Sequence, residues 1–175
     1  MTYSLETPTE RNQEMTVTNV EKNKDNLTMT ITAEFDAPVE RVWQLWENPR
    51  LLERWWGPPT YPATFTDFNM NPGGNVGYYM TGPEGERHGG WWRFVKISAP
   101  HSLEFEDGFS DDKGIPNPKM PSTVTRVALT GKTAGGTRMT IASTWSSLQD
   151  MEQMIAMGME EGMAAAMGQM DALLA

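Results

Sequence analysis

The chain contains no cysteine. This absence excludes disulfide bonds, thiolate metal ligands and cysteine nucleophiles at once. Nothing in the sequence therefore requires an oxidising compartment, and the polar N-terminal residues contain no apolar signal-peptide core. We expect a cytoplasmic protein.

Basic residues are few, because 14 Lys and Arg stand against 23 Asp and Glu, and the formal net charge is −9. A nucleic-acid surface needs clustered Lys and Arg, and a surface for anionic lipid needs a basic segment. The basic residues here are scattered. No apolar run approaches the roughly 20 residues that cross a bilayer. We therefore predict no nucleic-acid partner and no membrane association.

Histidine is scarce as well, since His88 and His101 are the only two. Both fall near expected turns, and neither forms a His-x-Glu or Glu-x-x-His pattern with a carboxylate. We predict no metal site and no cofactor. There is also no Ser-His-Asp set, so no catalytic residue is identified. The prediction leans towards a non-enzyme, although a cavity enzyme can act by positioning a reactive substrate with few polar groups.

The composition is that of a globular protein, with 38% hydrophobic and 10% aromatic residues. A length of 175 residues suits one domain. We expect residues 1–14 to form a flexible N-terminal leader and residues 15–175 to form a single domain.

Alternating apolar and polar residues predict an antiparallel sheet. Residues 27–35 give the clearest case, because every second side chain from Leu27 to Phe35 is apolar and those between are polar. Further strands are expected at residues 16–20, 61–70, 76–81, 87–97, 102–109, 123–130 and 137–145.

Helical patterns follow the first strands and close the chain. Pro38 suits a first helical turn, and apolar residues recur at helical spacing from Val39 towards Trp56, which predicts two short helices. The longest element is a C-terminal helix of about 27 residues, Leu148 to Leu174, roughly 40 Å long. Its apolar stripe must be buried against the sheet. The predicted fold is α+β, a curved antiparallel β-sheet wrapped around this helix with an apolar cavity between them.

Methionine is concentrated in the C-terminal helix, which holds seven of the 14. Four of them recur on one helical face: Met159, Met163, Met167 and Met170. Methionine is flexible and polarisable, so this face can form a deformable wall for a hydrophobic ligand, but ordinary core packing explains the stripe equally well. Gly158 and Gly162 each cost about 1 kcal/mol relative to Ala. That cost suggests close approach to the sheet or room for a ligand, and simple tolerance stays open.

Inward-facing strand residues supply the rest of the predicted cavity, since small-molecule sites are mostly apolar with a few placed polar groups. Trp55 and Trp56 are adjacent and cannot share a helical face, so we expect one in the core and one at the cavity mouth. The candidate ligand-binding residues are Trp46, Trp56, Met70, Tyr78, Met80, Trp92, Phe105, Asp107, Val127, Met139, Ile141, Trp145, Met159 and Met163.

Asp107 is the one acidic residue among these candidates. It has the strand parity of Leu103 and Phe105, so its carboxyl can face the cavity with a raised pKa. Its position near a strand end fits a solvated carboxylate as well. Arg93 and Arg126 have the parity of outward-facing residues and are not expected to meet a ligand.

Several motifs resemble the SRPBCC superfamily, which has the START-like, helix-grip fold. They are residues 35–43 and 49–58, Asn71-Pro-Gly-Gly74, Gly82-Pro-Glu-Gly85, residues 97–105, residues 136–141 and Glu161-Gly-Met163. Within that superfamily the chain is similar to the group named for the activator of the Hsp90 ATPase. Asn69 stands where members often carry Asp, and Met163 stands where Trp usually follows the glycine, which implies a softer pocket floor.

The resemblance implies the fold and leaves three functions open, because the superfamily includes lipid carriers, polyketide cyclases and chaperone activators. The leading hypothesis is a binding protein that encloses a hydrophobic or aromatic small molecule, gated by the loop from Ser110 to Pro121. The second is a cyclase-, aromatase- or hydrolase-type enzyme acting on such a ligand. The third is a protein associated with an Hsp90-type ATPase. Monomer and homodimer both stay open.

Overall fold

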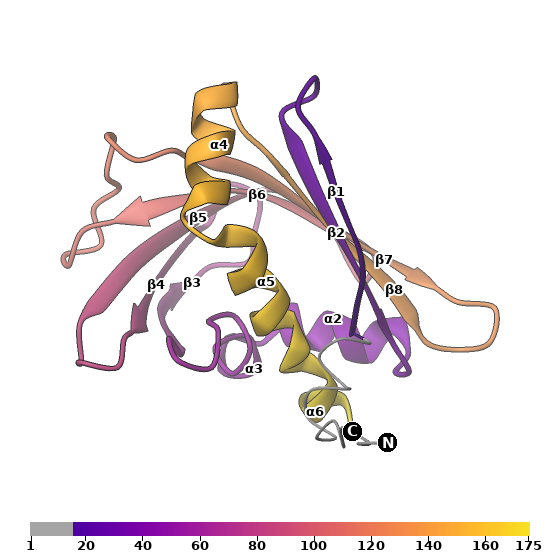
Figure 1. Cartoon of the computed structure of the whole chain (residues 1–175). Helices are drawn as coiled ribbons and strands as arrows, with labels where there is room; N and C mark the ends of the chain where they lie inside the picture. The colour runs from indigo at the N-terminus through magenta and orange to yellow at the C-terminus, as the bar shows by residue number, and fades with distance from the viewer. Residues whose placement is uncertain (1–15) are drawn as a thin grey trace, which may run out of the picture.

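Eight antiparallel strands form one sheet that wraps around the C-terminal helices (Figure 1). The computed structural model describes residues 16–175, so the predicted leader at residues 1–14 lies outside the described residues. The strand order is β1-β2-β8-β7-β6-β5-β4-β3. The strands are β1 Val17–Asn23, β2 Thr28–Phe35, β3 Ala63–Phe68, β4 Asn75–Thr81, β5 Arg87–Ser98, β6 Ser102–Ser110, β7 Thr123–Gly131 and β8 Thr137–Thr144. The predicted antiparallel sheet and helix-grip fold are confirmed.

The period-two pattern of β2 places its apolar side chains on the concave face. Met29, Ile31, Ala33 and Phe35 are buried, and the residues between them are half-buried. Strand β8 pairs with β2 in register, Ile31 opposite Ile141, and its alternate residues are buried in the same way. The two strands thus contribute one continuous apolar surface to the core.

Two short helices, α2 Val39–Glu47 and α3 Pro49–Leu52, connect β2 to β3. Pro38 is the N-terminal cap of α2, with an extended backbone, and Asn48 caps α3 by accepting a hydrogen bond from the Arg50 N–H at 2.9 Å. Five residues of α2 are buried, including Trp43 and Trp46. Helix α2 therefore inserts an apolar face between the sheet and the end of the chain.

The C-terminal helix is broken, and the prediction of one continuous helix is wrong. It consists of α4 Leu148–Ala156, α5 Met159–Gly168 and α6 Met170–Leu174. Gly158 separates the first two with a φ of 89°, a left-handed conformation that helices do not contain. Because residues with a Cβ rarely adopt this φ, the glycine permits the change of direction between α4 and α5 (Figure 1).

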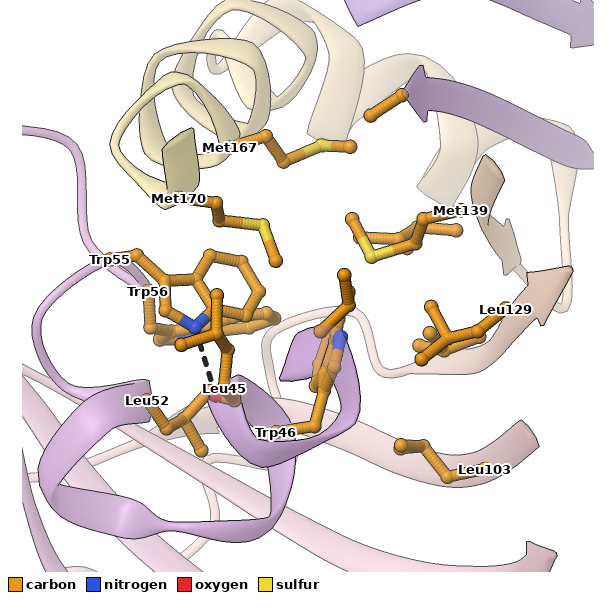
Figure 2. Packing of buried hydrophobic residues seen from close by; sticks show 14 of the residues in the cluster. Leu45, Trp46, Leu52, Trp55, Trp56, Leu103, Leu129, Met139, Met167 and Met170 are labelled. Carbon is orange, nitrogen blue, oxygen red and sulfur yellow. Dashed lines mark hydrogen bonds between the residues drawn. The ribbon is translucent and has the colours of Figure 1, made fainter. Parts of the chain in front are cut away.

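Aromatic residues fill the core beneath α5 and α6. Trp55 is fully buried, and its Nε1–H donates to the Leu45 carbonyl at 2.9 Å. Figure 2 shows Met167 and Met170 pointing from the helices towards Trp55 and Met139. This end of the interface between sheet and helices is packed with large side chains.

Candidate functional site

A cavity of about 300 Å³ lies at the other end of the interface, where α4 meets α5. Its walls come from the α4–α5 junction, from strands β4, β5 and β6, from the start of β7, and from the segment that follows α3. The lining is predominantly apolar. It lies on the concave side of the sheet, as the sequence predicts.

Methionines form the helical wall of the cavity. Met154 and Met157 come from the end of α4, and Met159 and Met163 come from α5. Gly162 lies between them, and a Cβ at this position would meet nothing within 4 Å beyond its chain neighbours and its own helix backbone. The missing side chain therefore leaves open space at the cavity wall, which favours room for a ligand over close approach to the sheet as the reason for this glycine.

Tyr78 dominates the sheet wall. Its ring stacks on Phe65, with centroids 5.0 Å apart, and lies edge-on to Trp56 at 6.3 Å. A Cβ at Gly90, its partner on β5, would lie only 2.2 Å from the Tyr78 Cζ. Gly90 thus makes room for the tyrosine ring to lie across β5.

Asp107 places a carboxyl against this apolar lining. Its Oδ1 is buried and has no hydrogen-bond partner. Burial raises the pKa of Asp107 to about 7, although the Thr123 side chain lowers it in part. The burial of Oδ1 therefore favours the inward-facing orientation over the solvated one.

The Tyr78 hydroxyl lies in the same environment. Burial raises the pKa of Tyr78 above its ordinary value, the charge of Asp107 raises it further, and the indoles of Trp56 and Trp92 lower it in part. Neither indole N–H makes a hydrogen bond of good geometry. Tyr78 is consequently a neutral phenol at physiological pH.

His88 and Met157 are exposed residues at the border of the cavity, and Pro121 is a buried one. His88 lies near the start of β5, next to the expected turn at Gly82–Gly85, with its Nε2 3.8 Å from Glu86 Oε1. Met157 is 55% exposed. Pro121 ends the loop that follows β6, in which the Asp111 carboxylate accepts hydrogen bonds from the Lys113 and Ile115 N–H groups. This loop borders the cavity, and its action as a gate stays a prediction.

The structure places six of the fourteen candidate residues at the cavity: Trp56, Tyr78, Met80, Asp107, Met159 and Met163. Seven others are buried in the core and do not line it: Trp46, Trp92, Phe105, Val127, Met139, Ile141 and Trp145. Met70 is half-buried after β3 and packs against the core. Strand parity identifies the residues of the concave face correctly. It does not show which part of that face is covered by α2 and α6 and which part borders the cavity.

Sequence reasoning missed other lining residues. Met154 and Met157 precede the helix break, so their position relative to Met163 depends on the φ of Gly158. Phe109 and Thr123 lie where β6 and β7 approach the loop between them. The cluster of methionines was the one available signal, and it did not show that residues from both sides of the break at Gly158 line the cavity.

The remaining ionisable candidates lie elsewhere. Arg93 and Arg126 are exposed, as expected, and Arg126 Nε lies 3.2 Å from Glu104 Oε1. His101 lies in the turn between β5 and β6, with its Nδ1 3.3 Å from the Leu129 carbonyl. Within residues 16–175 no three His, Asp or Glu side chains are grouped to hold a metal ion. No helix of that part of the chain is long and apolar enough to cross a membrane.

A sheet that grips C-terminal helices and leaves an apolar cavity beside them defines a START-like, helix-grip protein. The chain belongs to the family of activator of Hsp90 ATPase homolog 1-like proteins, whose model matches residues 36–175. This family is of SRPBCC type, so the resemblance seen in the sequence is confirmed.

Solved structures agree with this assignment. Protein Ms6760 from Mycobacterium smegmatis is 46% identical, with a TM-score of 0.84 over 91% of this chain and 97% of that chain. A protein from Arthrobacter aurescens is 52% identical, with a TM-score of 0.87 over 91% and 92%. One from Staphylococcus epidermidis is 28% identical, with a TM-score of 0.78 over 90% and 93%. The comparison with curated proteins gave no match.

Proposed function

We propose that the protein binds a hydrophobic or aromatic small molecule in the cavity between the sheet and the α4–α5 junction. The observation that carries this proposal is the open space beside Gly162, lined by methionine and aromatic side chains. Its volume of about 300 Å³ lies at the small end of the range for ligand sites. Flexible methionines on the helical wall can adapt to the shape of such a ligand.

A binding screen tests this function, in which native mass spectrometry and thermal shift are measured with apolar metabolites. We expect at least one compound to raise the melting temperature and to add its mass to the protein. The Gly162→Leu variant should lose both effects, because the new side chain occupies the cavity. Ala156→Leu adds the same side chain on the exposed face of α4 and is the matched control. The proposal fails if no apolar compound raises the melting temperature of the wild-type protein. It also fails if Gly162→Leu and Ala156→Leu both bind the compound as the wild type does.

An enzyme acting on such a ligand is the second candidate, and Asp107 is the observation that favours it. A carboxyl with a pKa of about 7 inside an apolar cavity can take up and release a proton at neutral pH. Mass spectrometry of a bound ligand incubated with the protein would detect turnover. We expect Asp107→Asn to stop the conversion while measurable binding remains. Unchanged ligand after prolonged incubation with the wild-type protein would remove this candidate.

Association with an Hsp90-type ATPase rests on the family description alone. Its test is co-purification with such an ATPase, together with the ATPase turnover in the presence of the protein. The cytoplasmic location and the oligomeric state, monomer or homodimer, stay predictions from the sequence. Fractionation and light scattering, respectively, measure them.

A further inference from the structure

The cavity offers a ligand one strong hydrogen-bond acceptor. Asp107 Oδ1 is buried without a partner, whereas the other side chains around it are mainly methionine, aromatic residues and proline. A buried acceptor that lacks a partner is costly, and the cost is larger when the group is ionised. A ligand that donates a hydrogen bond to this oxygen would remove that cost.

The charges around the cavity have one sign near the acceptor. No Lys or Arg is among the lining residues in the described part of the chain. The titratable groups that line it are Asp107, Tyr78 and His88. Tyr78 stays neutral, and His88 lies at the exposed side beside Glu86. An acidic ligand would therefore bring its negative charge to a buried carboxylate with no lining Lys or Arg to compensate it.

We propose that the occupant is an apolar or aromatic molecule with a single hydroxyl or amine group that donates a hydrogen bond to Asp107, and that carboxylic acids are rejected. This inference rests on the proposed function, because it names the class of ligand that the same cavity takes. The apolar body lies against the methionine wall formed by Met159 and Met163. The donor points to the sheet, between Tyr78 and the start of β7.

Three probes with one carbon skeleton test the proposal: 2-naphthalenemethanol, its methyl ether and 2-naphthoate. Titrations are followed at pH 8 by NMR of ¹³C-labelled methionine methyl groups, since Met80, Met154, Met157, Met159 and Met163 all line the cavity. We expect the alcohol to bind at least about tenfold more tightly than the ether, because a hydrogen bond to a charged group is worth about 1.5–3 kcal/mol. We expect no saturable shifts with the carboxylate.

Two variants separate the hydrogen bond from the shape of the site. Asp107→Leu should bind the alcohol and the ether equally, and Asp107→Asn should regain measurable binding of 2-naphthoate because the charge is gone. Glu106→Gln is the matched control, since this residue precedes Asp107 on β6 and points to the opposite side of the sheet. It should keep the wild-type order of the three probes.

The outcomes distinguish this inference from the function on which it rests. If all three probes shift the cavity methionines with equal affinity, the cavity binds apolar ligands but the proposed ligand class is wrong. If the carboxylate binds best, the class is also wrong. If no probe shifts any cavity methionine of the wild-type protein, the proposed function fails and the ligand class with it.

Discussion

The two ends of the interface between the sheet and the C-terminal helices use the same residue type with opposite results. At the α6 end, Met167 and Met170 are fully buried among tryptophans (Figure 2). At the α4 end, Met159 and Met163 line a cavity, and Met157 is 55% exposed. A methionine stripe therefore identifies the helix face that meets the sheet. It does not show whether the space between that face and the sheet is filled by side chains.

Helix α2 accounts for the difference. It contacts both α6 and β7, so its tryptophans fill the space beneath the end of the chain. By contrast, no helix of the described residues lies between α4 and the sheet (Figure 1). Small residues at Gly158 and Gly162 then leave the α4 end open. One end thus stabilises the fold, whereas the other carries a buried charge and an unfilled volume that a ligand can use.

The largest effect is expected at the cavity end, at Asp107. Burial raises its pKa from 3.8 to about 7, so the folded protein holds a proton that the unfolded chain releases between those values. The free energy of unfolding therefore falls as the pH rises from about 4 to 7, by at most about 4 kcal/mol. Asp107→Asn should remove this loss and be more stable than the wild type at pH 8, as urea denaturation at several pH values would show.

Asp171 also has a pKa raised by burial, with its carboxylate accepting a hydrogen bond from Thr16. Asp171 is present in both the wild type and Asp107→Asn. Its contribution therefore cancels when the pH dependence of the free energy of unfolding is subtracted between the two proteins. Glu106→Gln is the control and should keep the pH dependence of the wild type. If Asp107→Asn were less stable than the wild type at pH 8, the surroundings of Asp107 would stabilise its ionised form. Burial of this carboxylate would then not lower the free energy of unfolding.

The next largest effect contrasts the two ends directly. Met167→Ala should lower the free energy of unfolding by about 3 kcal/mol, because it leaves a cavity in a packed core. Met163→Ala should lower it by less than about 1 kcal/mol, because this side chain already borders empty space. Chemical denaturation of the two variants measures both values. Equal losses would contradict the distinction between a packed end and an open end.

The smallest effects concern the two glycines. Gly158→Ala should destabilise the protein by about 1–2 kcal/mol, since its φ of 89° is unfavourable for a residue with a Cβ. Gly162→Ala should stabilise it by up to about 1 kcal/mol, because the methyl group meets no neighbour and alanine favours the helix. Thermal denaturation of both variants would settle the sign. Stabilisation by Gly158→Ala would mean that α4 and α5 form one continuous helix.

The sheet and its concave face could be predicted from the sequence. Apolar and polar residues alternate strictly along β2, and buried residues alternate along β8 in the same way. The break at Gly158 could not be predicted, because glycine is compatible both with a helix and with the observed φ of 89°, and the sequence does not distinguish the two. The absence of Trp92 and Phe105 from the cavity lining could not be predicted either. Their parity places them correctly on the concave face, but their rings stack on each other with centroids 4.1 Å apart in the core behind the lining residues.

Two features of the sequence lead to incompatible predictions for Asp107, and of the two the solvated carboxylate is favoured. Parity pointed its side chain inwards, and position near a strand end pointed to solvent. Strand β6 continues to Ser110 and pairs with β5 up to that residue, so Asp107 is not at the frayed end of the strand. The expected strand already extends to residue 109, so its length does not decide the environment of this carboxyl. That environment depends on the α4–α5 junction, which lines the same cavity and which strand parity does not show.

A crystal structure of the protein with 2-naphthalenemethanol tests the distinction between the two ends most directly. We predict density for the naphthalene ring between Tyr78 and Met163, with the hydroxyl oxygen within hydrogen-bond distance of Asp107 Oδ1. Met167 and Met170 should keep their positions in the packed core. Density for the probe beneath α6, or a cavity closed by rearranged methionines with no probe bound, would contradict the binding function proposed for the α4 end.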